Sequence, residues 1–325
     1  TLLSHVWYSS TVCTRSRGMR ATILAALEQS GDPSLIDFKL HDFGCRGVSS
    51  METAAIGAAA HLVNFKGSDT LPGLTLAAAV YHEDCAGYSI PAAEHSTITS
   101  WGREQEVDAF ANMLTAYPSG LVAVVSDSYD IFAACENLWG ERLREQVLNR
   151  DGVLVIRPDS GPPAETVVRV LNILGEAFGY TVNAKGYKVL DPHVRVIQGD
   201  GIDDVSLGLI LDAIMAAGWS ADNVAFGSGG GLLQKMNRDT QKCAIKASAV
   251  RVNGQWRDVY KDPVTDAGKR SKRGRLALIR EDDGTYRTIR EEELGDRQNV
   301  LEIVFQDGTV IRDQTFAEIR VLAAV

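Results

Sequence analysis

Glu94 and His95 place a carboxylate directly before an imidazole, inside the stretch from Tyr88 to Thr97 and just after a short apolar run. A neutral imidazole can accept a proton, a metal ion or a phosphoryl group near pH 7. A single histidine is more often a hydrogen-bonded structural residue. The pair therefore predicts chemistry only if the rest of the chain brings other polar groups to it.

Two glycine-containing loops could supply an anion site. The segment Gly227-Ser228-Gly229-Gly230-Gly231 follows an apolar run, and Gly199-Asp200-Gly201 follows another. Glycine lacks the Cβ that would block a close approach, so such loops can turn several backbone N–H groups toward one anion. Neither loop contains the Gly-Lys-Ser or Gly-Lys-Thr of a P-loop, and each could be no more than a tight turn.

Arg157 and Asp159 form a second polar pair after an apolar run. A guanidinium binds phosphate or stacks on a ring, and a carboxylate two residues further on accepts from ribose hydroxyls. The alternative is a local ion pair at a strand end. Asp69 and Asp130 could likewise be helix caps, and Phe43 could be a core residue.

The elements that position these residues repeat in order from residue 38. A short β-rich run leads into a polar loop and then an amphipathic helix, and this happens about seven times. Parallel strands buried by helices favour closure into a (β/α) barrel, where the loops after the strands share one rim; an open doubly wound sheet is the alternative. The expected strands are 38–40, 62–65, 88–90, 121–125, 153–156, 194–197 and 224–226.

The ends of the chain have a different pattern. A helix is expected over Arg20–Gln29, and hairpins are expected around Asn253-Gly254 and Asp307-Gly308. We therefore expect a barrel domain over residues 36–240. Residues 1–35 and 241–325 would form parts of a second, smaller α/β domain.

Composition limits the function. The net charge of −9 argues against a protein whose whole surface binds nucleic acid or an anionic membrane. No apolar run is long enough to span a membrane, and the five scattered cysteines disfavour a disulfide framework or zinc cluster. A soluble cytoplasmic protein is expected. The basic run 269–275 has no aromatic residue of its own, which favours a polyphosphate over a nucleic-acid partner.

Taken together, the motifs resemble the nicotinamide phosphoribosyltransferase family over most of the chain and in the family's order. They are Leu40–Gly44, Arg46–Ser50, His61–Gly67, Pro91–Thr97, Val125–Asp130, Ile156–Gly161, Val196–Gly201, Phe226–Lys235 and Lys261–Leu276. The resemblance implies a type II phosphoribosyltransferase-like (β/α) barrel with a second, smaller α/β domain. It also implies transfer of phosphoribosyl from phosphoribosyl pyrophosphate to nicotinamide, coupled to ATP hydrolysis through a phosphohistidine.

The resemblance further implies a role for each matching residue. His95 would be the phosphorylated histidine, with Glu94 beside it and Asp130 as its orienting partner. Asp159 would hold the ribose hydroxyls, while Asp69 would accept from the carboxamide NH₂ and so favour nicotinamide over nicotinate. The remaining substrate-binding residues would be Phe43 and Arg157 around the ring, Ser126, Gly199, Asp200, Gly229 and Gly230 around the nucleotide, and Arg46, Lys235, Arg238, Lys246 and Lys269 against pyrophosphate or ATP.

The same resemblance implies Mg²⁺ with unassigned ligands, ATP as a co-substrate, and a homodimer with its sites at the subunit interface. Neither nucleic acid nor membrane is an expected partner. The chain starts without an initiator Met, and the family carries a long segment before the point that matches Thr1, so an amino-terminal segment is expected to be missing. The alternatives are a nicotinate phosphoribosyltransferase, or a non-catalytic nucleotide-binding paralogue or fragment.

Overall fold

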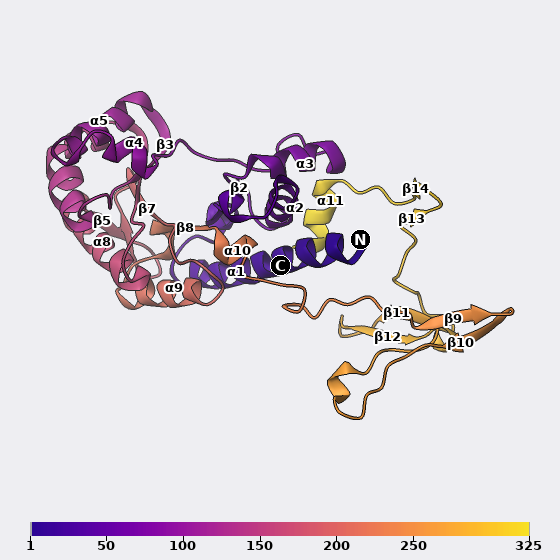
Figure 1. Ribbon diagram of the computed structural model, residues 1–325. Coiled ribbons are helices and arrows are strands. Elements are labelled where there is room, and N and C mark those ends of the chain that lie inside the picture. The colour runs from indigo at the N-terminus through magenta and orange to yellow at the C-terminus, as the bar shows by residue number, and fades with distance from the viewer. Residues whose placement is uncertain (1, 325) are drawn as a thin grey trace. The chain divides into compact units, whose positions relative to one another are not determined.

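The computed structural model describes residues 2–324 and is shown in Figure 1. The chain divides into two compact units. The larger consists of Leu2–Gln241 and the segment from Thr315 onward, and the smaller is Lys242–Gln314.

A six-stranded parallel sheet forms the centre of the larger unit, and its strand order is β2-β1-β8-β7-β4-β3. The strands are β1 (Leu40–Asp42), β2 (Gly67–Ser68), β3 (Ser119–Val125), β4 (Asp151–Arg157), β7 (Val194–Gln198) and β8 (Val224–Ser228). Their central residues are almost all buried, as expected for strands covered by helices. The predicted parallel α/β architecture is confirmed.

The two edges of this sheet are joined by the extended segment 88–93. Tyr88 forms a parallel bridge with Gly67 of β2, and Ala92 forms one with Ala123 of β3. Backbone hydrogen bonds make both junctions: the Tyr88 N–H donates to Lys66 O, and the Ala93 N–H donates to Ala123 O. The sheet is therefore curled, and residues 88–93 occupy the position of the strand expected at 88–90.

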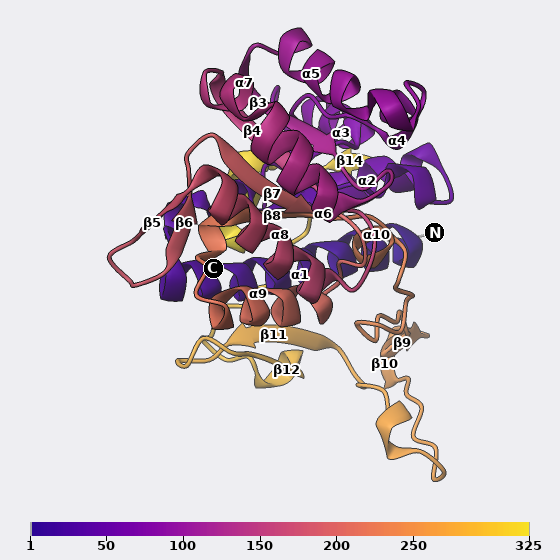
Figure 2. The same cartoon turned by 90° about the vertical axis from the view of Figure 1, so that its left-hand side faces the viewer.

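Two apolar clusters hold the curled sheet. Inside the curl, Ala123, Val155 and Ile197 pack together, with Ile90 and Phe43 against them. Outside, a large cluster buries the amphipathic faces of the helices, and Figure 2 shows α5, α7, α8 and α9 around β3, β4, β7 and β8. The helices are α2 (Met51–Leu62), α3 (Leu71–Tyr81), α4 (His95–Thr99), α5 (Glu106–Ala116), α6 (Ile131–Ala133), a π-helix (Ala134–Arg142), α7 (Arg144–Leu148), α8 (Pro163–Phe178), α9 (Ser206–Ala216) and α10 (Gly230–Leu233).

One expected strand is wrong. Leu62 is the last residue of α2 and residues 63–65 follow it in a turn, and the strand that pairs with β1 is Gly67–Ser68. The β-branched and aromatic side chains of Val63 and Phe65 suggested a strand, but Phe65 is buried and stacks on the His61 ring at 5.2 Å. Tertiary packing overrides the local preference there.

The amino-terminal segment differs from the expected division. It forms one long helix, α1 (Leu2–Ser30), which buries Val12, Met19, Ile23 and Leu27 in the core of the larger unit. The small and polar residues of its first half hide this face from a hydrophobicity pattern. After the smaller unit the chain returns as α11 (Phe316–Ala323), whose Phe316 is also buried in the larger unit. Residues 2–35 therefore pack with the sheet and do not join residues 242–314.

The smaller unit is built from short hairpins. Asn253 and Gly254 both have positive φ, as do Asp307 and Gly308, so both predicted turns are confirmed. A third hairpin follows the basic run. The strands are β9 (Ala249–Val252), β10 (Gln255–Asp258), β11 (Leu276–Arg280), β12 (Tyr286–Arg290), β13 (Phe305–Gln306) and β14 (Thr309–Val310); in the larger unit, β5 (Tyr180–Val182) pairs with β6 (Lys188–Leu190).

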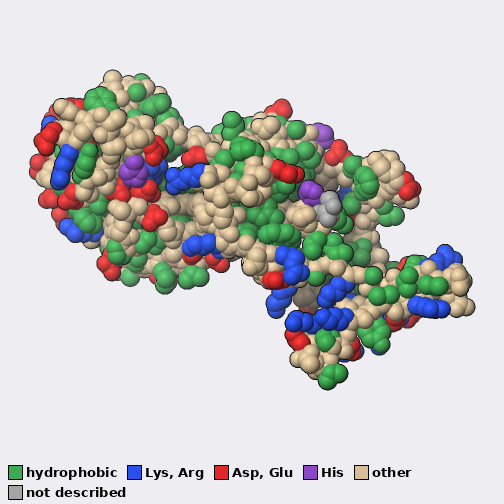
Figure 3. Space-filling view, in the orientation of Figure 1, with side chains coloured by type: hydrophobic (Ala, Val, Ile, Leu, Met, Phe, Trp, Pro, Cys, Tyr) green, Lys and Arg blue, Asp and Glu red, His purple; other side chains and the backbone are tan. Residues whose placement is uncertain are grey.

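The basic run has partners within the smaller unit, where Figure 3 shows Lys and Arg side chains gathered. Lys269 pairs with Asp266 at 3.3 Å, and the Arg273 guanidinium lies 4.9 Å from the ring centroid of Tyr260. The run has no aromatic residue of its own, but Tyr260 lies against Arg273, and Trp256 of β10 lies against Arg275 at 5.2 Å. No helix among residues 2–324 is both long and apolar enough to cross a membrane.

A buried histidine, His61, links α1 to the sheet. His61 is fully buried; its Nε2 lies 3.1 Å from Gly67 O, and its Nδ1 lies 2.9 Å from the Ser16 hydroxyl. Because a carbonyl oxygen can only accept, Nε2 carries the proton and Nδ1 accepts from Ser16. Burial lowers the pKa of His61 from 6.5 to about 4.

Between these two pKa values the unfolded chain binds a proton that the folded chain does not. Stability should therefore fall by roughly 1–3 kcal/mol as the pH drops from 6.5 to 4. Thermal unfolding between pH 4 and 7 measures this loss. His61→Gln keeps a donor and an acceptor, and it should flatten the pH dependence. An equal slope in wild type and His61→Gln would contradict the assignment.

Candidate active site

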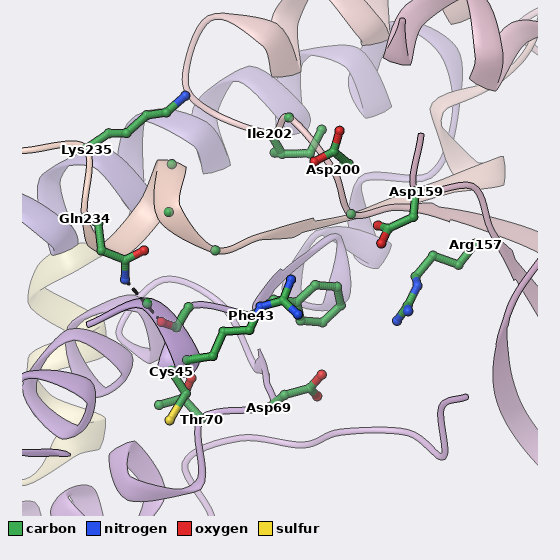
Figure 4. A pocket seen from close by; sticks show the side chains of 18 of the residues that line it. Phe43, Cys45, Asp69, Thr70, Arg157, Asp159, Asp200, Ile202, Gln234 and Lys235 are labelled. Carbon is green, nitrogen blue, oxygen red and sulfur yellow. Dashed lines mark hydrogen bonds between the residues drawn. The ribbon is translucent and has the colours of Figure 1, made fainter. Parts of the chain in front are cut away.

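A cavity of about 570 Å³ opens at the carboxyl ends of the parallel strands. Its lining comes from the loops after β1, β2, β4, β7 and β8 and from the start of α4. Figure 4 shows Phe43, Asp69, Arg157 and Asp159 turned toward the same space. The expected convergence of the polar loops on one rim is confirmed for these residues.

Asp127 holds His95 in place. Its Oδ1 lies 2.9 Å from His95 Nε2, and its Oδ2 accepts from the Asp159 N–H at 3.1 Å. The Asp127 side chain is only 4% exposed, so these two donors satisfy a buried carboxylate. Because the Asp127 carboxylate accepts from the Nε2–H, His95 Nδ1 is directed toward the Asp159 carboxylate, 3.9 Å away.

The strand register explains this cluster. Val125 of β3 pairs with Arg157 of β4, so Asp127 and Asp159 each lie two residues beyond a paired position. Burial raises the pKa of the Asp159 carboxyl, and the nearby Asp127 and Asp200 add to this rise, while Arg157 and His95 oppose it. Asp159 is therefore a carboxyl group that gains from a donor or a cation in the cavity.

The expected orienting role of Asp130 is wrong. Asp130 caps α6, where its Oδ1 accepts from the N–H groups of Phe132 and Ala133, both at 3.0 Å. The loop between β3 and α6 carries two aspartates, and the one nearer the strand faces His95. The one nearer the helix satisfies the unpaired helical N–H groups instead.

Glu94 lines the cavity but its carboxylate is used locally. Its Oε2 accepts from the Ser96 backbone N–H and from the Ser96 hydroxyl, and it forms a capping box with Thr97 at the start of α4. The hydrogen bond from the Ser96 hydroxyl is the main reason that the Glu94 pKa is lowered. Glu94 therefore orients the helix turn that presents His95.

Phe43 lies over the backbone of two glycines. A Cβ at Gly227 would lie 2.0 Å from Phe43 Cε2, and one at Gly199 would lie 3.5 Å from it. Only glycine at position 227 therefore leaves room for this ring position. The exposed face of Phe43 is available for a flat ligand ring.

Asp69 and Arg157 supply polar groups beside that ring. The Asp69 Oδ1 accepts from the Ser89 hydroxyl at 2.5 Å. Arg157 Nε is buried without a hydrogen-bond partner among the described residues. A ligand with a planar ring, a donor for Asp69 and an acceptor for Arg157 fits these groups.

The glycine loops line the other end of the cavity. Gly199, Gly229 and Gly230 line the cavity, and Gln234 Nε2 donates to Gly44 O at 3.1 Å, as the dashed line in Figure 4 marks. Lys235 Nζ lies 3.3 Å from the Asp203 carboxylate. Arg46 also lines the cavity, so its wall combines glycine backbone with cationic side chains.

Most predicted site residues meet in this cavity. Besides Asp130, four of them do not line it. Ser126 is fully buried, where its hydroxyl accepts from Trp139 Nε1 and donates to Val124 O. Arg238 pairs with Asp239, and Lys246 and Lys269 belong to the smaller unit, so their roles stay predictions. The predicted residues that line the cavity are Phe43, Arg46, Asp69, Glu94, His95, Arg157, Asp159, Gly199, Asp200, Gly229, Gly230 and Lys235.

The sequence interpretation missed Asp127, Thr70 and Gln234. Asp127 follows its strand by the same two residues as Asp159 does, and that shared offset could have identified it. Thr70 has a buried hydroxyl without a partner among the residues described, and Gln234 lies just beyond the last glycine loop. No residue-type pattern singles out the latter two.

Comparison with known proteins gives consistent results. The model of the nicotinate phosphoribosyltransferase (NAPRTase) family matches residues 38–309. The chain is 56% identical over 329 residues to a nicotinamide phosphoribosyltransferase of Xanthomonas campestris, covering 98% of this chain and 70% of that protein. It is 32% identical to one of Acinetobacter baylyi, covering 98% of this chain and 68% of that protein.

Coverage of other relatives is lower. A nicotinamide phosphoribosyltransferase of Mycoplasma pneumoniae is 34% identical, and the match covers 85% of this chain and 62% of that protein. The solved nicotinate phosphoribosyltransferase of Porphyromonas gingivalis has 13% identity and a TM-score of 0.47, covering 82% of this chain and 60% of that one. The chain thus spans about two thirds of the length of the relatives that it matches.

The Asp127–His95 hydrogen bond can be tested without a ligand. With Nε2–H donating to Asp127, His95 should populate the Nε2–H tautomer, and Asp127→Asn should change the tautomer balance because an amide can also donate. Nitrogen-15 NMR of the imidazole ring measures the tautomer. Asp130→Asn is the matched control and should leave His95 unchanged. The assignment fails if Asp130→Asn perturbs the His95 ring nitrogens and Asp127→Asn does not.

Proposed function

The chain belongs to the nicotinate phosphoribosyltransferase (NAPRTase) family, and from this premise we propose that it makes nicotinamide mononucleotide. In this reaction the phosphoribosyl group of phosphoribosyl pyrophosphate moves to the ring nitrogen of nicotinamide, and pyrophosphate leaves. The product enters NAD salvage.

The observation that carries this proposal is Asp69 beside Phe43 and Arg157. The pyridine ring stacks on Phe43, the carboxamide NH₂ donates to Asp69, and the carboxamide oxygen accepts from Arg157. Nicotinate would place its carboxylate against the carboxylate of Asp69, and this repulsion favours the amide. The sequence similarity to nicotinamide phosphoribosyltransferases supports the same choice of base.

Ribosyl transfer uses the centre and the glycine end of the cavity. Asp159 accepts from the ribose hydroxyls, and the N–H groups of the loops at Gly199 and Gly229 meet the phosphates. The transition state resembles an oxocarbenium ion, so a carboxylate near the ribose and cations near the departing pyrophosphate both stabilise it. Arg46 and Lys235 are the lining cations at that end.

His95 would couple ATP hydrolysis to the reaction. Asp127 holds Nε2, so Nδ1 is the nitrogen that can attack the γ-phosphorus of ATP; ADP leaves, and water later releases the phosphate. Asp127 also stabilises positive charge on the imidazole as the new bond forms.

Mg²⁺ fits the donor set. Asp159 and Asp200 both line the cavity, and their mutual repulsion would be relieved by a cation. The described residues hold no group of three or more acidic, histidine or cysteine ligands, but Mg²⁺ usually takes one or two carboxylates and completes its shell with substrate phosphates and water. Bound there, Mg²⁺ would neutralise pyrophosphate charge.

A homodimer with its sites near the interface is also part of the proposal. An almost wholly apolar surface hollow, formed by α2 and α3, adjoins the cavity, because Cys45 and Asp69 line both. Met51 and Leu71 on this surface are 62% and 70% exposed. Exposed apolar surface of this kind favours association. We also propose a cytoplasmic enzyme, where scattered cysteines remain reduced.

The preference for nicotinamide over nicotinate is tested by measuring the product from each base. Product formation from each base, followed by chromatography, should show nicotinamide mononucleotide as the preferred product of the wild type. Asp69→Asn removes the repulsion and one acceptor, so the nicotinamide-to-nicotinate ratio of kcat/KM should fall by about tenfold or more. Preference of the wild type for nicotinate would overturn the assignment of Asp69.

Phosphoryl transfer to His95 is tested separately with γ-labelled ATP. The wild type should acquire an acid-labile label, and His95→Ala should abolish it. His193→Ala is a matched control, because His193 Nδ1 also lies 2.8 Å from an aspartate, Asp191, but outside the cavity. Asp127→Asn should slow labelling about tenfold or more, by loss of a hydrogen bond to a charged group. A label that persists in His95→Ala rules out the phosphohistidine.

A further inference from the structure

Ser89 is bound to the carboxylate that would select the base. Its hydroxyl donates to Asp69 Oδ1 at 2.5 Å. Nothing in the family resemblance assigned a role to Ser89, which is exposed and does not itself line the cavity. Its contact with the site is through Asp69.

The backbone on both sides of this contact is fixed. The Asp69 N–H donates to Asp42 O at 3.0 Å, which anchors Asp69 to the end of β1. Ser89 directly follows Tyr88, whose N–H and C=O are both bonded to the chain beside β2. The parallel register that closes the sheet therefore places Ser89 next to Asp69.

The Ser89 hydroxyl determines which oxygen of Asp69 can accept from a ligand and how that oxygen is oriented. With Oδ1 occupied by Ser89, Oδ2 is the oxygen left to accept from a ligand amide. A free aspartate side chain can rotate about χ1 and χ2, and a carboxylate held at one oxygen loses much of that freedom before the ligand arrives. An oriented acceptor binds an amide more tightly than a rotating one.

We propose that Ser89 is a positioning residue that sets the amide selectivity of the base site by holding Asp69 for the carboxamide NH₂. This inference rests on the proposed function. It separates two contributions to selectivity: Asp69 repels nicotinate by its charge, and Ser89 increases the affinity for nicotinamide by orienting the acceptor.

The two contributions predict different kinetics. Ser89→Ala should raise the KM for nicotinamide about tenfold, the loss expected when one hydrogen bond to a charged group goes, and leave kcat within about twofold. Its kcat/KM for nicotinate should not change, because the Asp69 charge remains. Ser89→Thr keeps the hydroxyl and should retain wild-type values.

A double-mutant cycle tests whether Ser89 acts through Asp69. In the Asp69→Asn background, Ser89→Ala should change the nicotinamide KM by less than about twofold, since the carboxylate that it positions is gone. Ser34→Ala is a matched control. The Ser34 hydroxyl also donates to an aspartate, Asp32 Oδ2 at 2.8 Å, in a turn outside the cavity, and its loss should leave both bases unaffected.

The outcomes are distinguishable. The inference is overturned if Ser89→Ala leaves the nicotinamide KM unchanged, if Ser89→Thr behaves like Ser89→Ala, or if the effect persists in the Asp69→Asn background. Equal losses for both bases with a lower unfolding temperature would indicate a structural role and would also overturn it. If the wild type makes mononucleotide from neither base, the proposed function fails instead.

Discussion

The hydrogen bonds on the two sides of residues 88–93 are the constraint on which the site depends. One side bonds to the chain beside β2 and the other to β3. These bonds bring the edges of a six-stranded sheet together, so that the ends of the strands surround one cavity. They also set the positions of Ser89 and His95, which lie in and just after this segment. An open sheet would leave Asp69 and Asp159 on distant strands.

Asp127 positions the polar groups at the centre of the cavity. A carboxylate that is almost wholly buried must find donors, and it finds them in His95 and in the backbone of Asp159. One group thereby fixes the imidazole and the neighbouring loop together. Burial raises the pKa of Asp159, and the neighbouring carboxylates of Asp127 and Asp200 add to the rise, so this carboxyl group gains from a hydrogen-bond donor or a cation beside it.

The sequence predicts the order of elements well because parallel strands and amphipathic helices leave strong periodicities. It predicts which loops meet, because they follow strands. It does not distinguish Asp127 from Asp130, since both residues suit a helix cap or an imidazole partner, and only the register decides between them. It also misses the first half of α1, whose buried face includes Thr11 and Ser16. Residues 2–35, which were expected in the smaller domain, belong to the larger unit. Ser89 looks like an ordinary loop serine until its hydroxyl is seen on Asp69.

In the proposed reaction, the base and the pyrophosphate would meet side chains that are held under opposite conditions. At the base end, Asp69 is already held by Ser89, so a ligand meets an oriented acceptor. Lys235, the proposed pyrophosphate contact, faces Asp203 at 3.3 Å, so pyrophosphate binding there would exchange one ion pair for another. The Lys235 side chain is 66% exposed, and exposed pairs contribute only about 0–1 kcal/mol, so this exchange costs little. Selectivity is thus expected where the groups are fixed, and turnover of a highly charged product is favoured where they are loosely paired.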